Sequence, residues 1–363
     1  MGHYTLLNIL SFLFSAVLGF LMIPRILHYC KKKKLYDIPN GRKVHKTFVP
    51  RLGGVSFMPS MFLAFITVVA SMAIQSEGTL QMSLSSVFFL AGLFIIYLTG
   101  VIDDIVGLRP INKLVMQIIA ASTLPLSSLY VNDFYGFCGI TMIPPFVGSF
   151  LTVFFIVYMI NAFNFIDGID GLSGCLALLI LTGLAIAFDR QELYYFVILI
   201  MALMGVITSF LYFNMFGDAS SNNKIFMGDS GSMTLGFVIS YLCIKYSMHN
   251  YAVMPFREDG LLLPYSLLIV PMFDLVRVSL VRIRQGKSVF TADKNHIHHK
   301  LMKAGCSQHA ALFIIMMLAF FFVMLNAMLS LVLQVTLIVA IDLVLWILFH
   351  VLLNSFINRR DGK

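Results

Sequence analysis

The chain has 363 residues, of which 59% are hydrophobic and only 12% are charged. A soluble domain carries about 25% charged residues, so this composition excludes an ordinary soluble protein and predicts an integral membrane protein. The net charge of +8 does not indicate a nucleic-acid partner, because positive charge collects in the cytoplasmic loops of membrane proteins. The five cysteines form no CxxC pair or disulfide framework, so no redox or zinc role is assigned to them.

Apolar runs of about twenty residues without strand-like alternation predict an all-α polytopic membrane protein with eleven transmembrane helices. These helices are expected at residues 5–29, 53–74, 84–101, 113–130, 149–166, 172–188, 193–213, 232–248, 261–281, 311–331 and 335–357. No internal repeat or low-complexity segment divides the chain. Residues 1–363 are therefore predicted to form a single membrane domain.

Lysine and arginine residues gather in the loops after the first, third, seventh and ninth predicted helices, beginning with Lys31–Lys34. Because cytoplasmic loops are enriched in these residues, the N-terminus is expected outside and the C-terminus in the cytoplasm. On the outer side, residues 129–146 combine alternating apolar positions, β-branched residues and glycines. This pattern predicts a small periplasmic β-hairpin.

Four polar clusters each follow an odd-numbered predicted helix. They are VIDDIVGLRPINK (101–113), NAFNFIDGIDGLSG (161–174), NKIFMGDSGS (223–232) and TADKNHIHHK (291–300). Each odd-numbered helix starts outside and ends inside, so all four clusters are expected at one cytoplasmic surface. Carboxylates near a bilayer cost about 2.5–3.5 kcal/mol each at mid-helix and mark functional sites by default. The clusters therefore predict one shared site.

Each of the first two clusters could have a purely structural role instead of a function. Asp103 and Asp104 could simply cap a helix in water, although Lys113 and the GLRP turn nearby favour a function. In the second cluster, polar residues recur every three positions, which keeps successive side chains within about 60° on a helix. These residues are Asn161, Asn164, Asp167 and Asp170. The glycines that follow them allow close approach of a ligand, which favours a binding site over a solvated helix end.

The third cluster could be only a turn, but Gly228 and Gly231 also place backbone N–H groups at a predicted helix start, which attracts anions. Asp229 between them would repel a bare phosphate and suits Mg²⁺. This ion takes hard oxygen ligands and typically one or two carboxylates, with phosphate oxygens and water completing its coordination.

The fourth cluster contains His296, His298 and His299. A zinc site is disfavoured, because no cysteine or histidine from a third segment is well placed to complete it. Hydrogen bonds from the imidazoles to phosphate oxygens are the preferred interpretation. The RKVHK segment (42–46) near the first cytoplasmic end adds His45 as a candidate substrate contact.

The order and spacing of these motifs resemble the polyprenyl-phosphate N-acetylhexosamine-1-phosphate transferases. The resemblance extends over almost the whole chain and includes DIPNGRKVHKTFVPRLGG (37–54), which is similar to the family's first cytoplasmic loop. It implies transfer of a sugar-1-phosphate from a UDP-sugar to undecaprenyl phosphate, a membrane lipid, with release of UMP. It also implies a bacterial inner-membrane enzyme with a cytoplasmic site that uses Mg²⁺, with Mn²⁺ as the alternative ion. A homodimer stays open.

The form HIHH followed by Lys300 and Leu301 resembles the branch of the family that handles UDP-N-acetylglucosamine. This branch starts lipid-linked envelope glycans such as lipopolysaccharide O-antigen. The peptidoglycan branch, which transfers phospho-MurNAc-pentapeptide, carries a longer histidine-rich motif, so that substrate is disfavoured but not excluded. A transporter is the alternative from another class. Carrier sites lie near mid-bilayer, often in two matching halves, whereas these clusters gather on one face.

The resemblance implies a role for each site residue. These roles are magnesium ligation by Asn164 and Asp229, essential acidic chemistry by Asp103 and Asp104, uracil recognition by Asp170, and phosphate contact by Lys113, His296, His298 and His299. Asn161 and Asp167 are expected to support the metal ligands. An aspartate could deprotonate the lipid phosphate or attack first as a nucleophile, so direct and two-step transfer both remain open.

Overall fold

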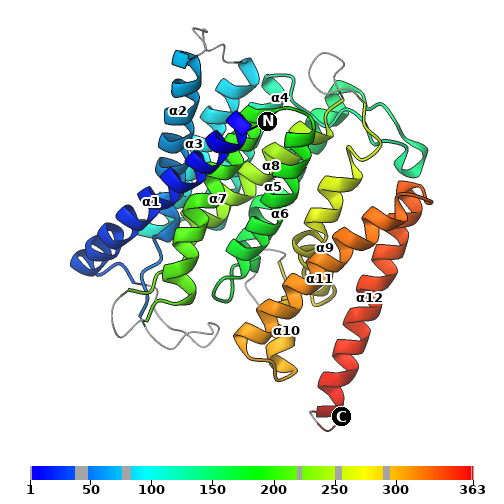
Figure 1. Cartoon of the computed structure of the whole chain (residues 1–363). Coiled ribbons are helices and arrows are strands. Elements are labelled where there is room, and N and C mark those ends of the chain that lie inside the picture. The colour runs from blue at the N-terminus through cyan, green and yellow to red at the C-terminus, as the bar shows by residue number, and fades with distance from the viewer. Residues whose placement is uncertain are drawn as a thin grey trace. The chain divides into compact units, whose positions relative to one another are not determined.

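The computed structural model describes residues 2–36, 48–75, 83–218, 223–249, 256–288, 295–360 and 362. The secondary structure in these ranges is almost entirely helical, which confirms the all-α prediction (Figure 1). The long helices are α1 (Gly2–Lys33), α2 (Phe57–Gln75), α3 (Leu84–Val106), α4 (Pro110–Leu126), α5 (Pro145–Ile166), α6 (Leu172–Arg190), α7 (Tyr194–Met215), α8 (Gly228–Ser247), α9 (Leu262–Arg284), α11 (Gln308–Leu329) and α12 (Val335–Arg360). The shorter helices are η1 (Gly53–Ser56), η2 (Phe137–Gly139) and α10 (Ile297–Lys303).

Each of the predicted transmembrane segments corresponds to one of the long helices. Among the described residues, 8 helices are long and apolar enough to cross a membrane, which supports a multi-pass membrane protein. These are α1, α2 with η1, α3, α5, α6, α7, α11 and α12. For α4, α8 and α9, membrane crossing stays a prediction, as do the total of eleven and the orientation. A spanning helix needs about 20 mainly apolar residues, whereas α4 has 17 and α9 contains Asp274 and several arginines.

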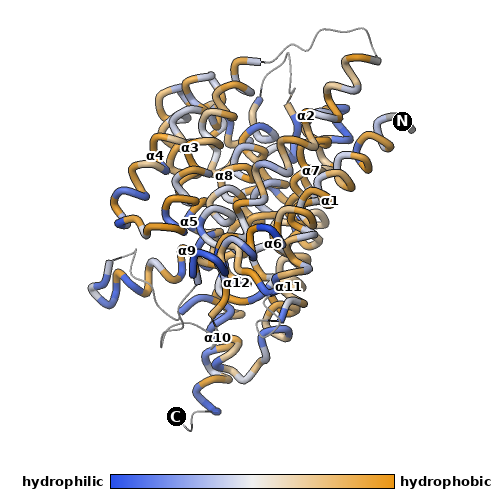
Figure 2. The backbone as a smooth tube through the Cα atoms, turned by 90° about the vertical axis from the view of Figure 1, so that its left-hand side faces the viewer, coloured by the Kyte–Doolittle hydropathy of each residue, from blue (hydrophilic) through white to orange (hydrophobic). Residues whose placement is uncertain are grey.

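The outward faces of several helices are apolar. Leu13 and Val17 of α1 are 52% and 53% exposed, and Val344 and Val351 of α12 are 64% and 56% exposed. In Figure 2, much of the helical tube has the orange colour of hydrophobic residues. Apolar surface of this extent is unusual on a soluble monomer, so we interpret these faces as surfaces for lipid.

The chain divides into two compact units. Unit 1 comprises Met1–Leu129 and Thr152–Cys243, and unit 2 comprises Tyr130–Leu151 and Ile244–Lys363. Within unit 1, α7 packs against α1, α2 and α6, and α3 packs against α4. Within unit 2, α9 packs against α11, and α10 packs against α11 and α12. This division does not test the prediction of a single domain, which stays a prediction.

Two glycines of unit 1 allow other segments to approach the start of α8. A Cβ added to Gly100 of α3 would lie 2.5 Å from the Ser230 Cα, and one added to Gly54 of η1 would lie 2.0 Å from the Gly231 nitrogen. Both distances are far shorter than a van der Waals contact between these atoms. Any side chain at these positions would push α3 or η1 away from α8, at the place where the candidate site lies.

The predicted β-hairpin at residues 129–146 is not formed by paired strands, although the structure describes this whole segment. An isolated antiparallel bridge joins Asp133 and Met142. Between them, Tyr135 and Cys138 have positive φ angles of 52°, and the short helix η2 replaces extended backbone. The alternating pattern therefore produces a compact reversal of the chain with one antiparallel bridge, in place of the paired strands that were predicted.

Candidate active site

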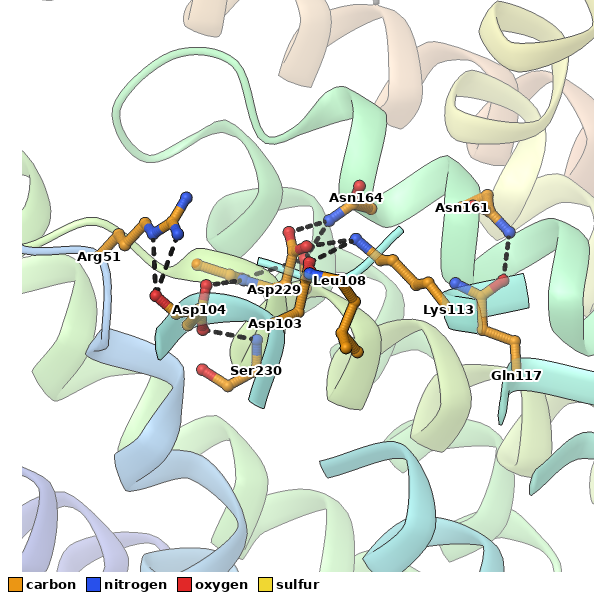
Figure 3. A network of polar contacts seen from close by, with 12 residues as sticks. Arg51, Asp103, Asp104, Leu108, Lys113, Gln117, Asn161, Asn164, Asp229 and Ser230 are labelled. Carbon is orange, nitrogen blue, oxygen red and sulfur yellow. Dashed lines mark hydrogen bonds and ion pairs between the residues drawn. The ribbon is translucent and has the colours of Figure 1, made fainter. Parts of the chain in front are cut away.

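Three of the four polar clusters meet in unit 1 where α8 begins (Figure 3). The last turns of α3 supply Asp103 and Asp104, and the first turn of α8 supplies Asp229. Lys113 comes from the first turns of α4, and Asn164 comes from the last turn of α5. Residues separated by more than a hundred positions in the sequence therefore share one polar network, as the sequence predicted for these three clusters.

Lys113 lies between two carboxylates. Its Nζ is 3.1 Å from Asp103 Oδ2 and also forms an ion pair with Asp229 Oδ2. Gly107, with a φ of 78°, ends α3 and turns the chain so that the Leu108 N–H donates to Asp103 Oδ1 at 2.5 Å. This turn leads directly into α4 and directs Lys113 back towards Asp103.

Asp104 acts as a cap for α8 from a neighbouring helix. Its side chain is buried, its Oδ1 accepts the Asp229 N–H at 2.8 Å, and its Oδ2 accepts the Ser230 N–H at 2.9 Å. The first N–H groups of a helix have no partner within the helix, and a carboxylate there is also stabilised by the helix dipole. Arg51 donates from Nε and Nη2 to the Asp104 main-chain oxygen at 3.2 and 3.0 Å.

The two adjacent aspartates are thus used differently. Both carboxylate oxygens of Asp104 accept hydrogen bonds from α8, whereas Asp103 faces the ammonium group of Lys113. Of the predicted acidic pair, Asp104 is the buried member, and Asp103 is the member whose carboxylate lies beside the side chain of Lys113.

Asn164 and Asp229 form a pair that fits a magnesium ion. Asn164 Nδ2 donates to Asp229 Oδ1 at 2.6 Å and to Ser232 Oγ at 3.0 Å. Side-chain amide oxygen and nitrogen are assigned from such contacts, and a half-turn of the amide would place the oxygen beside the carboxylate. The part of the chain that the structure describes holds no group of three or more His, Cys, Asp or Glu suited to a metal. One carboxylate and one amide oxygen, with phosphate and water, match the preference of Mg²⁺.

Asn161 lies one helical turn before Asn164 and faces α4 instead of Asp229. Its Nδ2 donates to Gln117 Oε1 at 2.8 Å and to the Val157 main-chain oxygen at 2.7 Å. The Gln117 side chain is buried. Asn161 therefore ties α5 to α4 close to Lys113, which is compatible with its predicted supporting role.

The loop between α5 and α6 brings two more acidic residues to the cluster. Burial, together with the negative charges of Asp229, Asp170 and Asp104, raises the pKa of Asp167 to about 8. Asp167 is therefore protonated at neutral pH and can donate a hydrogen bond. Asp170 Oδ2 forms an ion pair with Lys224 Nζ at 2.6 Å, so its predicted contact with uracil would have to compete with this lysine.

Asn214 of α7 joins this loop to the segment that leads into α8. Its Oδ1 accepts the Gly171 N–H at 2.7 Å, and its Nδ2 donates to the Ile225 main-chain oxygen at 2.9 Å. Gly171 has a φ of 80° and directly precedes α6. Asn214 is buried, and it holds two site segments in place.

The histidine cluster belongs to unit 2. His296 directly precedes α10, and its Nδ1 is 2.8 Å from Asp274 Oδ2. His298 is 1% exposed, and the rings of His298 and His299 have centroids 4.2 Å apart. Burial, together with the neighbouring His299 and His296, lowers the pKa of His298 to about 3. The three histidines predicted to contact phosphate thus lie together, whereas His45 lies outside the described residues.

Comparisons with known proteins place the chain in a family. The family model of glycosyl transferase family 4 matches residues 86–247. A decaprenyl-phosphate N-acetylglucosaminephosphotransferase of Mycobacterium leprae is 31% identical over 302 residues, which cover 76% of this chain and 72% of the relative. The chain belongs to glycosyl transferase family 4.

Two further relatives are also named as N-acetylglucosaminyl phosphate transferases that act on a polyprenyl phosphate. A probable undecaprenyl-phosphate N-acetylglucosaminyl 1-phosphate transferase of Bacillus subtilis is 28% identical, over 86% of this chain and 82% of the relative. An undecaprenyl-phosphate alpha-N-acetylglucosaminyl 1-phosphate transferase of Escherichia coli K12 is also 28% identical, over 80% of this chain and 75% of the relative. The resemblance predicted from the motifs is therefore confirmed.

Several residues that hold the predicted site segments of unit 1 and of unit 2 were missed by the sequence analysis. They are Arg51, Gln117, Asn214, Lys224 and Asp274. The available signal was a polar residue within or at the end of an apolar run, which applies to Gln117, Asn214 and Asp274. Arg51 and Lys224 lie in polar loops, where composition alone does not distinguish them from orientation signals.

Proposed function

We propose that this family 4 member transfers N-acetylglucosamine-1-phosphate from UDP-N-acetylglucosamine to undecaprenyl phosphate and releases UMP. The names of the relatives support the transferred group and the polyprenyl acceptor. The observation that carries the proposal is the group of Asp103, Lys113, Asn164 and Asp229 at the start of α8. The product would begin a lipid-linked glycan of the bacterial envelope.

The chemistry requires two phosphate-bearing substrates to approach each other. When bound by Asn164 and Asp229, Mg²⁺ would polarise phosphoryl oxygens and offset their charge. Lys113 can contact a phosphate oxygen while it stays near Asp103, because its ammonium group has three donors. Phosphoryl transfer depends mainly on positioning and charge stabilisation, which this arrangement of acidic, amide and basic groups can provide.

Asp103 is the proposed base. An oxygen of the lipid phosphate attacks the phosphorus bonded to the sugar, and the bond from that phosphorus to the oxygen of UMP breaks. The second ionisation of a phosphomonoester lies near pH 6, so a fraction of the acceptor must lose a proton to the Asp103 carboxylate. Asp104 is less suited to this step, because it is buried and both of its oxygens accept N–H groups of α8, whereas Asp103 lies beside the proposed phosphate contact Lys113.

A two-step transfer through an aspartyl phosphate is the alternative path. Purified protein supplied with UDP-N-acetylglucosamine but no lipid distinguishes the two. Direct transfer gives no UMP under these conditions, whereas the two-step path gives a burst of UMP equal to the amount of enzyme.

The proposed substrates are tested with membranes that contain the protein, undecaprenyl phosphate and a panel of UDP-sugars. We expect UMP release and a lipid-linked sugar diphosphate with UDP-N-acetylglucosamine, and neither product from membranes without the protein. Release of UMP with UDP-MurNAc-pentapeptide alone would reassign the protein to the peptidoglycan branch. The absence of UMP with every donor would refute the proposal.

We further propose that the site faces the cytoplasm of a bacterial inner membrane, with the N-terminus outside. The donor is a charged cytoplasmic metabolite that does not cross the bilayer unaided. In a cysteine-free background, Arg109→Cys and Ser288→Cys should react with a membrane-impermeant thiol reagent only after the cytoplasmic side is opened. Glu258→Cys should react in intact cells. All three positions are exposed, and reaction of Arg109→Cys from outside would reverse the proposed orientation.

A further inference from the structure

Asp274 of α9 is an acidic residue for which the proposed reaction has no role so far. The residue is 1% exposed, and its two carboxylate oxygens bind three groups. Oδ2 contacts His296 Nδ1 at 2.8 Å, while Oδ1 accepts the Ile297 N–H at 3.1 Å and Arg277 Nη2 at 2.6 Å. Ile297 is the first residue of α10, so Asp274 satisfies one of the N–H groups that a helix start leaves without a partner.

Two arginines complete the surroundings of His296. Arg277 Nη2 also donates to the main-chain oxygen of Asn295, directly before the histidine motif. Arg282 is fully buried, and its Nη2 is 3.4 Å from His296 Nε2. Both ring nitrogens of His296 therefore face groups of unit 2 itself.

These contacts select one tautomer of His296. A carboxylate only accepts hydrogen bonds, so Nδ1 must carry the hydrogen that is donated to Asp274. A guanidinium group only donates, so Nε2 must offer its lone pair to Arg282. The partner of one ring nitrogen sets the state of the other, and here both partners demand the same ring orientation.

The ring of His298 differs from that of His296 in its hydrogen bonding. It is as buried as Asp274, yet neither ring nitrogen has a hydrogen-bond partner among the described residues. Buried polar side-chain atoms nearly always have a partner, so an unpartnered ring in a predicted phosphate-binding motif indicates a place for a ligand. The low pKa of His298 means that the neutral ring offers one donor and one acceptor at physiological pH.

We infer that Asp274 is a positioning residue that holds His296 in the Nδ1–H tautomer and fixes the start of α10, so that His298 and not His296 contacts substrate phosphate. The inference rests on the proposed function for the identity of the ligand. It changes the roles expected from the sequence, in which the histidines were equivalent phosphate ligands.

Two substitutions of His296 separate the roles of its ring nitrogens. The amide nitrogen of Asn lies near the position of Nδ1, whereas that of Gln lies near Nε2. If Nδ1 binding to Asp274 matters, His296→Asn lowers kcat/KM about threefold and His296→Gln lowers it about 30-fold, within the 10–100-fold range seen when ligand-orienting partners are lost. The reverse order would overturn the inference, because it would make Nε2 a substrate contact.

A double substitution tests whether Asp274 acts through the motif. Asp274→Asn presents an N–H group to one of its three donors, so we expect a 10–100-fold lower kcat/KM. His298→Asn should lower kcat/KM at least as much. The kcat/KM of the double variant should be at most about threefold below that of the less active single variant. Multiplied losses would show that Asp274 acts independently of His298. Exposed His309 at the start of α11 supplies the controls His309→Asn and His309→Gln, which should match the unmodified protein.

A spectroscopic measurement gives an answer without activity. In purified protein with ¹⁵N-labelled histidine, the His296 resonances, assigned with His296→Asn, should show the Nδ1–H tautomer. This signature should be lost in Asp274→Asn. An Nε2–H tautomer in the unmodified protein would refute the inference whatever the activity. The Nδ1–H tautomer together with no UMP release from any UDP-sugar would refute the proposed function and leave Asp274 as the residue that sets the His296 ring.

Discussion

One polar cluster of unit 1 and one polar cluster of unit 2 have opposite surplus charge. In unit 1, three carboxylates gather at the start of α8, and one ammonium group lies between two of them. These residues are Asp103, Asp104, Asp229 and Lys113. In unit 2, a single carboxylate, Asp274, lies with the guanidinium groups of Arg277 and Arg282 around His296. A negative surplus suits a divalent cation and a positive surplus suits phosphate, so each cluster has the charge that its proposed ligand requires.

The largest expected effect follows from removing the carboxylate that both Lys113 and Asn164 contact. Asp229→Asn should lower kcat by about 10³-fold, because the proposed metal site contributes several kcal/mol of charge stabilisation. UMP release in detergent-solubilised protein measures the loss. Asp189→Asn, at the exposed end of α6, is the matched control and should have normal turnover. Turnover of Asp229→Asn within tenfold of normal would remove Asp229 from the proposed metal site.

Lys113→Met should lower kcat/KM by about 10²-fold, in the range found for loss of one preorganised charge-stabilising donor. In this variant Asp103 and Asp229 face each other without the ammonium group, so the negative surplus of the unit 1 cluster increases. Added Mg²⁺ should therefore raise the melting temperature of Lys113→Met more than that of the unmodified protein, because a ligand that binds only the folded state stabilises it. Equal shifts in the two proteins would indicate that Mg²⁺ binds elsewhere.

The long helices could be predicted from the sequence, because length and hydropathy determine a membrane helix almost alone. The roles of neighbouring side chains could not. Asp103 and Asp104 are identical residues, but successive positions on a helix differ by about 100°. One consequently meets Lys113 and the other meets the start of α8. The predicted β-hairpin had a different limit, since the positive φ angles of Tyr135 and Cys138 cannot be deduced from an alternating pattern.

The contacts of Arg51 and Asn214 show a second limit. Arg51 binds a main-chain oxygen 53 positions away, and Asn214 joins the start of α6 to the lead into α8. Such partners depend on how the helices pack, which the sequence pattern of each helix does not contain. The motifs identified candidate site residues. The structure adds Arg51 and Asn214, which hold the segments of the candidate site in place.

A smaller effect should separate the two adjacent aspartates. Asp104→Asn keeps one acceptor for the α8 N–H groups and replaces the other, so we expect a loss of about 1 kcal/mol, typical of a lost helix cap. Its kcat should fall roughly tenfold or more, because α8 also carries Asp229. Asp103→Asn should lose at least as much activity with less loss of stability. Thermal unfolding and UMP release on the same preparations measure both. A lower melting temperature for Asp103→Asn than for Asp104→Asn would contradict the assigned roles.

The smallest effect concerns Asp167 and depends on pH. Its pKa of about 8 in the folded protein lies above the usual value of about 3.9 for an aspartate. Between these values the unfolded chain has released the proton and the folded chain keeps it, so the contribution of Asp167 to stability falls as pH rises and levels off above about pH 8. Asp167→Asn resembles the protonated carboxyl and cannot ionise.

The melting temperature of Asp167→Asn relative to the unmodified protein should therefore increase from pH 5.5 to pH 8 and then stay constant. At pH 7 its kcat/KM should fall no more than about threefold, whereas Asp167→Ala, which also loses the hydrogen-bonding group, should fall further. Asp189→Asn serves again as control and should melt in parallel with the unmodified protein across this range. Parallel curves for Asp167→Asn as well would show that Asp167 is already ionised at neutral pH. In that case the acidic surplus of unit 1 would be larger by one charge, and the case for a cation there would be stronger.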